Sequence, residues 1–389
     1  MAHAASNMCD YVRTKLDPLG ERGLGRVDSL VFSWLSYLSM PPEVAGTPGD
    51  CRITLADLAR PEWAESLCGR TFAPSSSWEL LQACAASPRY SCVVVSDYVE
   101  DSDERAQRQF SATTFELPGH GHYVAFRGTD NTLVGWKEDF NMAYATEVPS
   151  QASAVAYLER IASTRDGDLL LGGHSKGGNL ATYAATMCAD SCHARVAGVF
   201  SHDGPGLSSA VAADARWERT RRLVDKTIPR SSVIGLLFEN QGVDVTVVKS
   251  DTVGLFQHDP FSWEVAGRDF VCAGHVGAGS ALIDSSLSAW LSQLAPEERA
   301  SFIDAVYNVV SASGEKTLAD IRRNWQVAVP RMVGAAQRLD EEEREHVMRA
   351  LRAIVDIAQP GRGRLSQLGL MMWESMLDRA AHRGTSRQA

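Results

Sequence analysis

The sequence predicts an α/β protein: a mostly parallel sheet flanked by helices, with an added helical region towards the C-terminus. Three observations predict it. Apolar, β-rich runs recur between residues 90 and 250. Helix-like segments lie between several of these runs, as in parallel sheets that are covered on both faces. After about Gly279 the runs stop, and apolar residues then recur at helical spacing.

Three segments are expected along the chain. Residues 1–88 are expected to form a helical and loop segment that packs on the core, residues 89–278 the α/β core, and residues 279–389 a helical subdomain. Within the first segment, residues 27–40 are an apolar helix candidate, and the Pro and Gly residues of 41–50 indicate a loop. In the last segment, apolar positions 302, 303, 306, 309 and 310 predict one helix, and positions 347, 348, 351, 354 and 355 predict another.

The core segment begins with a predicted hairpin. Two β-rich runs, residues 90–99 and 109–117, are separated by the polar stretch "EDSDERAQR". Further strands are expected in the runs 122–129, 168–174, 194–204, 226–237 and 242–250.

Composition excludes several classes of partner. Hydrophobic residues make up 44% of the chain, enough for a large core. The formal net charge of −10 argues against a nucleic acid or an anionic membrane surface as the main partner. No run is long enough to span a membrane, and the first residues lack a signal-peptide pattern. Most of the eight cysteines, among them Cys92 and Cys272, stand in apolar surroundings, so we interpret them as reduced core thiols of a cytoplasmic protein.

One cluster invites a metal hypothesis. Cys188 and Cys192 are four residues apart, and His193 is adjacent. Zinc sites that have such spacing are completed by a second pair, which is missing here. We therefore expect no metal and no cofactor.

The stretch "LLLGGHSKGGNLATYAA", residues 169–185, carries the strongest functional signal. Residues 173–177 fit G-x-S-x-G, in which a serine nucleophile occupies a sharp turn between a strand and a helix and small neighbours let the two approach. In the alternative interpretation, Ser175 merely caps the helix. The apolar strand before it and the small-residue helix after it favour Ser175 as a nucleophile.

A serine nucleophile needs a base and an acid. His258 follows the last clear strand and is our candidate base, with His275 in reserve; the alternative is an ordinary loop histidine. Asp203 follows the strand of residues 194–204 at the carboxyl edge of the sheet, where α/β sites gather, and is the candidate acid; the alternative is a turn aspartate. The oxyanion hole is expected from the backbone N–H of Lys176 and from the loop that has Thr129 at its turn.

The motifs "VAFRGTD", "GWKEDF", "GHSKGGNLA" and "QHDPFSW" follow one another along the chain. In these motifs and their order the chain resembles the class 3 lipases, a group of α/β-hydrolases, and more closely a bacterial lipase-like family marked by "GHSKGGN" and "DGPG"; the resemblance covers roughly residues 25–275. The resemblance implies an α/β-hydrolase fold in which Ser175 matches the nucleophile, His258 the histidine and Thr129 the oxyanion residue. Asp139 matches an aspartate near the oxyanion loop, a structural anchor.

The sequence departs from this resemblance at the acid. Class 3 lipases place it after the next-to-last strand, in a segment that here reads "TIPRSSVIGLL", with Ser232 roughly at the aspartate position. For that reason the acid role moves to Asp203, one strand earlier.

Two classes of function follow. The first is a serine hydrolase that cleaves carboxylic esters or lipids, small-molecule substrates, through a Ser-His-Asp triad and an acyl-enzyme. The second is a non-catalytic protein on the same fold, or one that acts on a thioester or an amide. The sequence carries no indication of an oligomeric state.

Overall fold

The computed structural model describes residues 6–45, 52–103, 108–130, 138, 142, 147–230, 232, 234–236, 242–252, 257–274, 296–315, 324–341, 344 and 347. The chain forms two compact units: Met1–Asp130 together with Ala145–Trp290, and Asn131–Tyr144 together with Leu291–Ala389.

An eight-stranded sheet is the centre of the first unit, with the strands side by side in chain order. They are β1 (Arg52–Thr54), β2 (Val94–Asp103), β3 (Arg108–Leu117), β4 (Gly121–Phe126), β5 (Leu169–His174), β6 (Val196–His202), β7 (Val224–Pro229) and β8 (Val245–Val248). Neighbours from β1 to β4 are antiparallel and neighbours from β4 to β8 are parallel. The predicted hairpin and the mostly parallel sheet are therefore confirmed.

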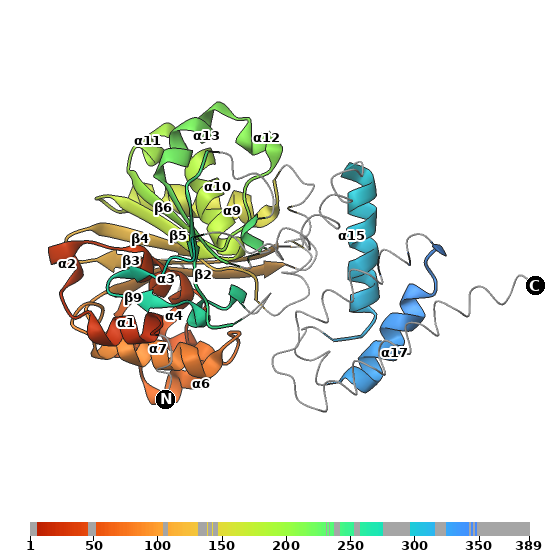
Figure 1. The fold of residues 1–389 in the computed structure, drawn as a ribbon, viewed down its shortest axis with the longest axis horizontal. Coiled ribbons are helices and arrows are strands. Elements are labelled where there is room, and N and C mark those ends of the chain that lie inside the picture. Colours follow the sequence, from red (N-terminus) through yellow and green to blue (C-terminus); the bar gives the residue numbers. More distant parts are fainter. Residues whose placement is uncertain are drawn as a thin grey trace, which may run out of the picture. The chain divides into compact units, whose positions relative to one another are not determined.

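Helices cover both faces of this sheet (Figure 1). On one face lie α1 (Met8–Thr14), α3 (Arg26–Leu35) and α7 (Pro74–Ala86); on the other lie α9 (Pro149–Thr164), α10 (Lys176–Met187) and α13 (Ala215–Thr220). Shorter helices are α2 (Leu19–Arg22), α4 (Pro42–Ala45), α5 (Leu55–Leu58), η1 (Pro61–Trp63), α6 (Ala64–Cys68), α11 (Asp190–His193), α12 (Ser209–Ala212), η2 (Arg221–Leu223), η3 (Ile234–Leu236) and η5 (Pro260–Ser262). A small ribbon pairs β9 (Val265–Ala266) with β10 (Asp269–Phe270).

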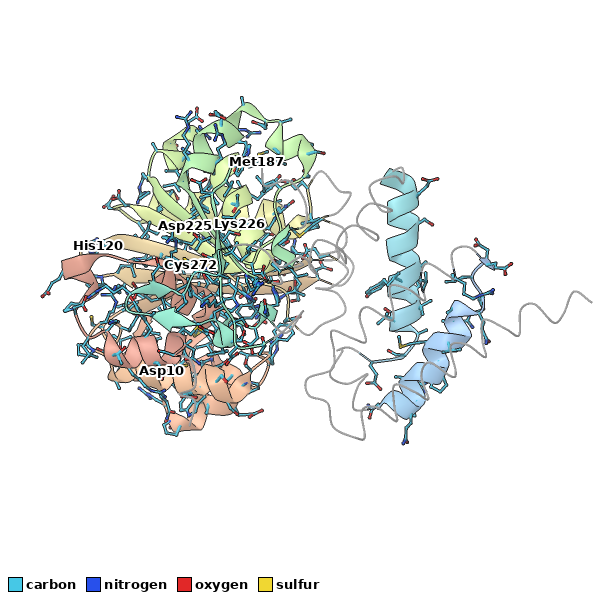
Figure 2. The ribbon with its side chains drawn as sticks, viewed as in Figure 1. Asp10, His120, Met187, Asp225, Lys226 and Cys272 are labelled. Atoms are coloured by element: carbon cyan, nitrogen blue, oxygen red, sulfur yellow. The ribbon has the colours of Figure 1, made fainter. Side chains whose placement is uncertain are left out.

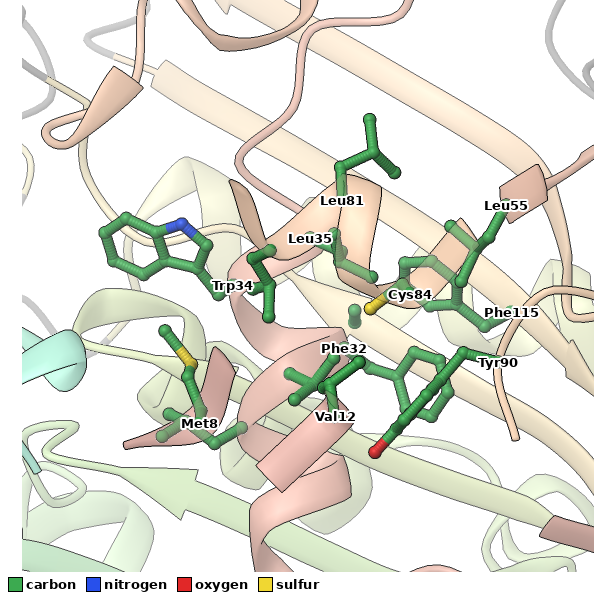
Figure 3. Packing of buried hydrophobic residues seen from close by; sticks show 14 of the residues in the cluster. Met8, Val12, Phe32, Trp34, Leu35, Leu55, Leu81, Cys84, Tyr90 and Phe115 are labelled. Carbon is green, nitrogen blue, oxygen red and sulfur yellow. The ribbon is translucent and has the colours of Figure 1, made fainter. Parts of the chain in front are cut away.

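The two faces bury separate apolar clusters. Under α3, the Phe32 and Phe115 rings pack with centroids 4.9 Å apart, and Tyr90 meets Phe32 edge-on (Figure 3). Under α9 and α10, the buried side chains include Leu158, Leu171 and Leu180. Each fully buried side chain of this size contributes about 1.5–3 kcal/mol, so packing on both faces stabilises the sheet that carries the site.

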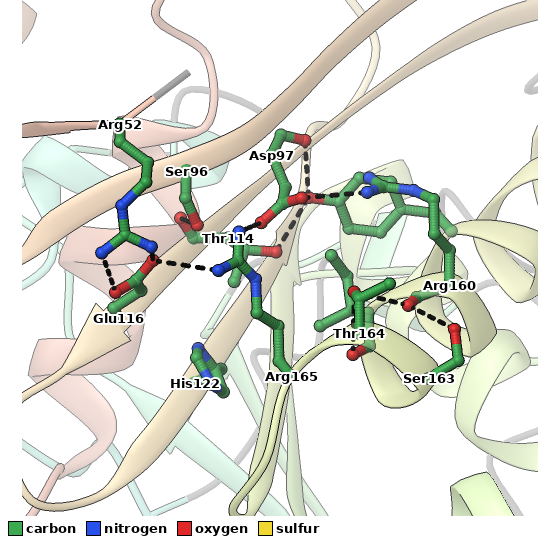
Figure 4. A network of polar contacts seen from close by, with 12 residues as sticks. Arg52, Ser96, Asp97, Thr114, Glu116, His122, Arg160, Ser163, Thr164 and Arg165 are labelled. Carbon is green, nitrogen blue, oxygen red and sulfur yellow. Dashed lines mark hydrogen bonds and ion pairs between the residues drawn. The ribbon is translucent and has the colours of Figure 1, made fainter. Parts of the chain in front are cut away.

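A bulge in β2 ties the sheet to α9 (Figure 4). The pairing of β2 with β3 shifts register between Ser96 and Val99, and Asp97 there has φ +54°. This left-handed backbone turns the buried Asp97 carboxylate to Arg160 and Arg165, at 2.9 Å each. The arginines lower the pKa of Asp97 although burial acts in the opposite direction. Strand and helix are thereby joined by charge as well as by packing.

Several expected elements differ in extent. The helix expected over residues 27–40 ends at Leu35, and the expected loop 41–50 contains α4. The strand expected over residues 226–237 runs from Val224 to Pro229. It ends at Pro229 because proline has no N–H to donate to the ladder. Cys92 and Cys272, interpreted from sequence as core thiols, are exposed, whereas Cys9, Cys68, Cys84, Cys188 and Cys192 are buried.

In the second unit, α15 (Pro296–Ser311) packs on α17 (Trp325–Ala336). The helix predicted from positions 302–310 is confirmed by α15. The sequence did not predict α17, and most of the helix predicted at 347–355 lies outside the described residues. Across the part of the chain that the structure describes, no helix combines the length and apolarity needed to cross a membrane.

Candidate active site

Ser175 is the single residue between β5 and α10, and its backbone adopts φ +57°. A non-glycine residue in this left-handed region is strained, and such strain clusters at functional sites. The Ser175 N–H donates to the carbonyl of His202 at 3.0 Å, which fixes the turn against the end of β6. The side chain makes no capping hydrogen bond to α10. The helix-cap alternative for Ser175 therefore has no contact to support it.

The flanking glycines have a steric reason. A Cβ on Gly173 would collide with the backbone of Gly177, and a Cβ on Gly177 would collide with the backbone of Phe126 at the end of β4. Strand β5, helix α10 and strand β4 thus converge where Ser175 stands. This is the close approach that the sequence pattern predicts for a nucleophile elbow.

Asp203 and His258 are 55 residues apart in the sequence and in contact in the structure. His258 Nδ1 lies 2.7 Å from Asp203 Oδ2, and because a carboxylate only accepts, the ring nitrogen donates. Asp203 directly follows β6, is buried, and has φ +49°; its N–H donates to the carbonyl of Thr227 in β7 at 2.7 Å. Asp203 therefore does more than close its own turn.

Ser232 approaches the other carboxylate oxygen. Its hydroxyl donates to Asp203 Oδ1 at 2.5 Å, and the N–H of Gly235 reaches the same oxygen at 3.2 Å. The position where the resemblance placed an aspartate thus holds a serine that touches the carboxylate of the neighbouring strand.

A buried lysine accompanies this carboxylate. Lys226 in β7, labelled beside Asp225 in Figure 2, donates from Nζ to the carbonyl of Gly204 at 2.7 Å. Burial lowers the pKa of Lys226 to about 8, while the Asp203 carboxylate acts in the opposite direction. The site therefore combines the Asp203 carboxylate with the buried Lys226 amine.

His174, the last residue of β5, contacts His258 through its ring. Its Nε2 lies 2.9 Å from the backbone carbonyl of His258, and the ring centroids are 4.6 Å apart. Tyr37 Oη lies 3.2 Å from His174 Nδ1. Burial holds the pKa of His174 well below its usual range, and nearby His258 acts in the same direction. His174 is thus a neutral ring between the elbow and the candidate base.

The expected oxyanion residues flank the elbow. Thr129 is buried in the loop after β4, and β4 pairs with β5. Lys176 begins α10, and its buried Nζ donates to the backbone carbonyl and Oε1 of Gln109 at 2.9 and 2.8 Å. Asp139 and the reserve base His275 lie outside the described residues.

Not every hydrogen bond expected within the predicted triad is present. Asp203 and His258 are hydrogen-bonded, whereas no bond between Ser175 Oγ and the His258 ring occurs among the described residues. Catalytic hydrogen bonds are often long before substrate binds and shorten in the substrate complex. Nor does any group of three or more His, Cys, Asp or Glu side chains in the described ranges have an arrangement that could hold a metal ion.

Sequence reasoning missed the roles of two residues. His174 stands inside the G-x-S-x-G motif, so its position was in view, but its contact with residue 258 spans 84 residues. Gly235 gave no local signal, since a glycine among apolar residues is typical of many turns.

Comparison with known proteins gives one family. A model of the Mbeg1-like family matches residues 84–308. No curated protein matches the chain. Among solved structures, the chain is similar to the crystal structure of M37 lipase, with 16% identity over 53% of this chain and 67% of that one, and a TM-score of 0.32. A score this low does not establish a shared fold, so the architecture rests on the sheet order itself.

Proposed function

The chain belongs to the Mbeg1-like family, and on this premise we propose that it is a serine hydrolase that cleaves carboxylic esters. Ser175 is the nucleophile, His258 the general base, and Asp203 the carboxylate that orients the base. The observation that carries the proposal is the 2.7 Å contact between His258 Nδ1 and Asp203 Oδ2, beside a strained serine at a strand–helix turn. A base, an acid and a hydroxyl at one sheet edge are the components of acyl transfer.

The reaction follows from the tautomer. With its Nδ1 proton donated to Asp203, neutral His258 has a lone pair on Nε2 that accepts the Ser175 hydroxyl proton. The serine oxygen attacks the ester carbonyl, and the tetrahedral intermediate expels the alkoxide, which takes the proton back from the ring. Water then attacks the acyl-enzyme. His258 removes a proton from the water as the oxygen bonds to the acyl carbon, the second tetrahedral intermediate expels the Ser175 oxygen, and that oxygen takes the proton back from the ring as the carboxylic acid leaves.

Two backbone N–H groups stabilise the oxyanion in this proposal, that of Lys176 and one from the loop that contains Thr129. The Lys176 side chain supports the first, because its two bonds to Gln109 fasten the start of α10 to β3. An N–H that is held before substrate arrives needs no reorganisation during the reaction.

Covalent labelling tests the nucleophile. A fluorophosphonate phosphonylates an activated serine, so wild type is expected to be labelled and Ser175→Ala is not. Ser163→Ala, which changes an exposed serine of α9, is the matched control and is expected to be labelled like wild type. A folded wild type that resists the probe would contradict the proposal and favour the non-catalytic alternative.

An ester chain-length series against wild type and Ser175→Ala then separates substrate classes. Hydrolysis of esters that is absent from Ser175→Ala supports the proposal. Turnover restricted to thioesters or amides would retain the triad but overturn the ester assignment.

A further inference from the structure

The carboxylate of Asp203 is held by a turn that follows the neighbouring strand. We propose that Ser232 is a positioning residue for Asp203, and that it acts together with the N–H of Gly235 to direct the free carboxylate oxygen at His258. The inference rests on the proposed function for its catalytic consequence, although the contacts stand by themselves.

The direction of the Ser232 hydrogen bond is determined by its neighbours. The N–H of Gly235 lies 3.0 Å from Ser232 Oγ and can only donate, so the hydroxyl oxygen accepts there. The hydroxyl proton is then free for Asp203 Oδ1, which lies 2.5 Å away. Bonds in such a chain strengthen one another in a low-dielectric interior, and both Ser232 and Asp203 are buried.

The two carboxylate oxygens consequently have different tasks. Oδ1 accepts from Ser232 and Gly235, whereas Oδ2 accepts from His258 Nδ1 at 2.7 Å. The rotation of an aspartate carboxylate about its last bond is soft, so packing alone fixes it poorly. Donors on one oxygen fix the plane of the group and therefore aim the other oxygen at the base.

Gly235 is part of this arrangement because of its size. A Cβ there would strike Asp203 Oδ1 and lie 2.8 Å from Ser232 Oγ. Only a residue without a side chain brings its N–H to both oxygens. The turn after β7 is thus shaped around the carboxylate, from the main chain as well as from the hydroxyl.

The first test measures turnover of an ester that wild type cleaves. Ser232→Ala is expected to lower kcat about 10- to 100-fold, as expected for the loss of a hydrogen bond to a charged group, and to leave KM unchanged. Ser232→Thr retains the hydroxyl and should restore most of kcat. Ser96→Ala removes another buried serine hydroxyl, in β2, and should match wild type. An unchanged kcat in Ser232→Ala would overturn the proposal.

A double-mutant cycle tests whether Ser232 acts through Asp203. If it does, Ser232→Ala should cost little further kcat once Asp203→Asn is present. An equal loss in both backgrounds would show an independent structural role and would overturn the inference.

Proton NMR gives a readout that does not depend on turnover. The Nδ1 proton of His258, bonded to Asp203, should resonate at unusually low field in wild type and in Ser96→Ala. It should disappear in Asp203→Asn and shift upfield or broaden in Ser232→Ala. If wild type cleaves no ester but Ser232→Ala still moves this resonance, the proposed function fails and the positioning role stands. A resonance that is identical in wild type and Ser232→Ala overturns the positioning role.

Discussion

His174 Nε2 donates a hydrogen bond to the backbone carbonyl of His258 at 2.9 Å, so the residue before the proposed nucleophile fixes the main chain of the proposed base. The carbonyl can only accept, which assigns the proton to Nε2 and leaves Nδ1 to accept from Tyr37. The strand that presents Ser175 thereby also holds His258. His258 is thus held at two points, through its main chain by His174 and through its ring by Asp203.

The first prediction concerns this contact. His174→Phe keeps a ring against His258 but removes the donor, so kcat is expected to fall about tenfold, near the value of one hydrogen bond. His174→Gln can place an amide donor near the same carbonyl and should recover part of the loss. Steady-state kinetics at neutral pH are the measurement. Equal losses in the Phe and Gln variants would assign the role to ring packing instead.

The second prediction concerns the acid. Asp203→Asn is expected to retain the fold and to lower kcat at least about a hundredfold. The amide can turn its NH2 group, a donor, towards His258 Nδ1 and so favour the tautomer that cannot accept the serine proton. Asp225→Asn is the matched control: its carboxylate bonds Arg26 at 2.7 Å, away from the base, and near wild-type kcat is expected. Asp251→Asn, on an exposed residue, should also match wild type. Loss of turnover in either control with normal turnover in Asp203→Asn would refute the assignment.

Local sequence patterns predicted the elements on which the site stands. The glycines around Ser175 indicate a close strand–helix turn because a Cβ at Gly173 or Gly177 meets backbone. Asp203 could be named because it follows a buried strand, and parallel strands bring their carboxyl ends to one edge.

Other features depend on contacts that no local pattern encodes. Strand β7 ends at Pro229 and the chain then turns. The turn brings Ser232 to Asp203, 29 residues earlier, and no local pattern in the sequence indicates this contact. The three-residue β1 is too short to show a period, and its assignment rests on pairing with β2. Such elements are determined by their neighbours rather than by their own residues.

The third prediction concerns stability at low pH. Burial lowers the pKa of His202 to about 3, and its Nδ1 has no hydrogen-bond partner among the described residues. Between about pH 6.5 and pH 3 the unfolded chain binds a proton that the folded chain does not, so the free energy of unfolding decreases as pH falls through this window. The slope for this group approaches about 1.4 kcal/mol per pH unit.

Urea unfolding between pH 7 and pH 4.5 checks this. His202→Gln should flatten the dependence by close to one proton. Ser29→Ala removes the hydroxyl 2.9 Å from His202 Nε2 but leaves the titrating ring, and it should lower stability while keeping the slope. A slope unchanged by His202→Gln would exclude this histidine as the source.

The last prediction concerns the buried ion pair under α3. Asp28 accepts from Arg89 Nε and Nη2 at 2.8 and 2.7 Å and from Tyr11 Oη at 3.2 Å, and neither Asp28 nor Arg89 reaches solvent appreciably. Asp28→Asn removes the buried counter-charge of the guanidinium and leaves it only the partly exposed Asp17 carboxylate, 3.5 Å from Arg89 Nη1. The free energy of unfolding should therefore fall by about 3–5 kcal/mol, measured by urea denaturation.

Its control is an exposed pair of the same kind. Arg13 and Glu79 lie 2.6 Å apart with about half of each side chain exposed. Water already solvates both charges, so Glu79→Gln should cost less than about 1 kcal/mol. Similar losses in Asp28→Asn and Glu79→Gln would mean that the Asp28 carboxylate does not offset the cost of burying the Arg89 charge. A large loss in Asp28→Asn with a small one in Glu79→Gln would show that the buried pair, unlike the exposed one, contributes substantially to the free energy of unfolding.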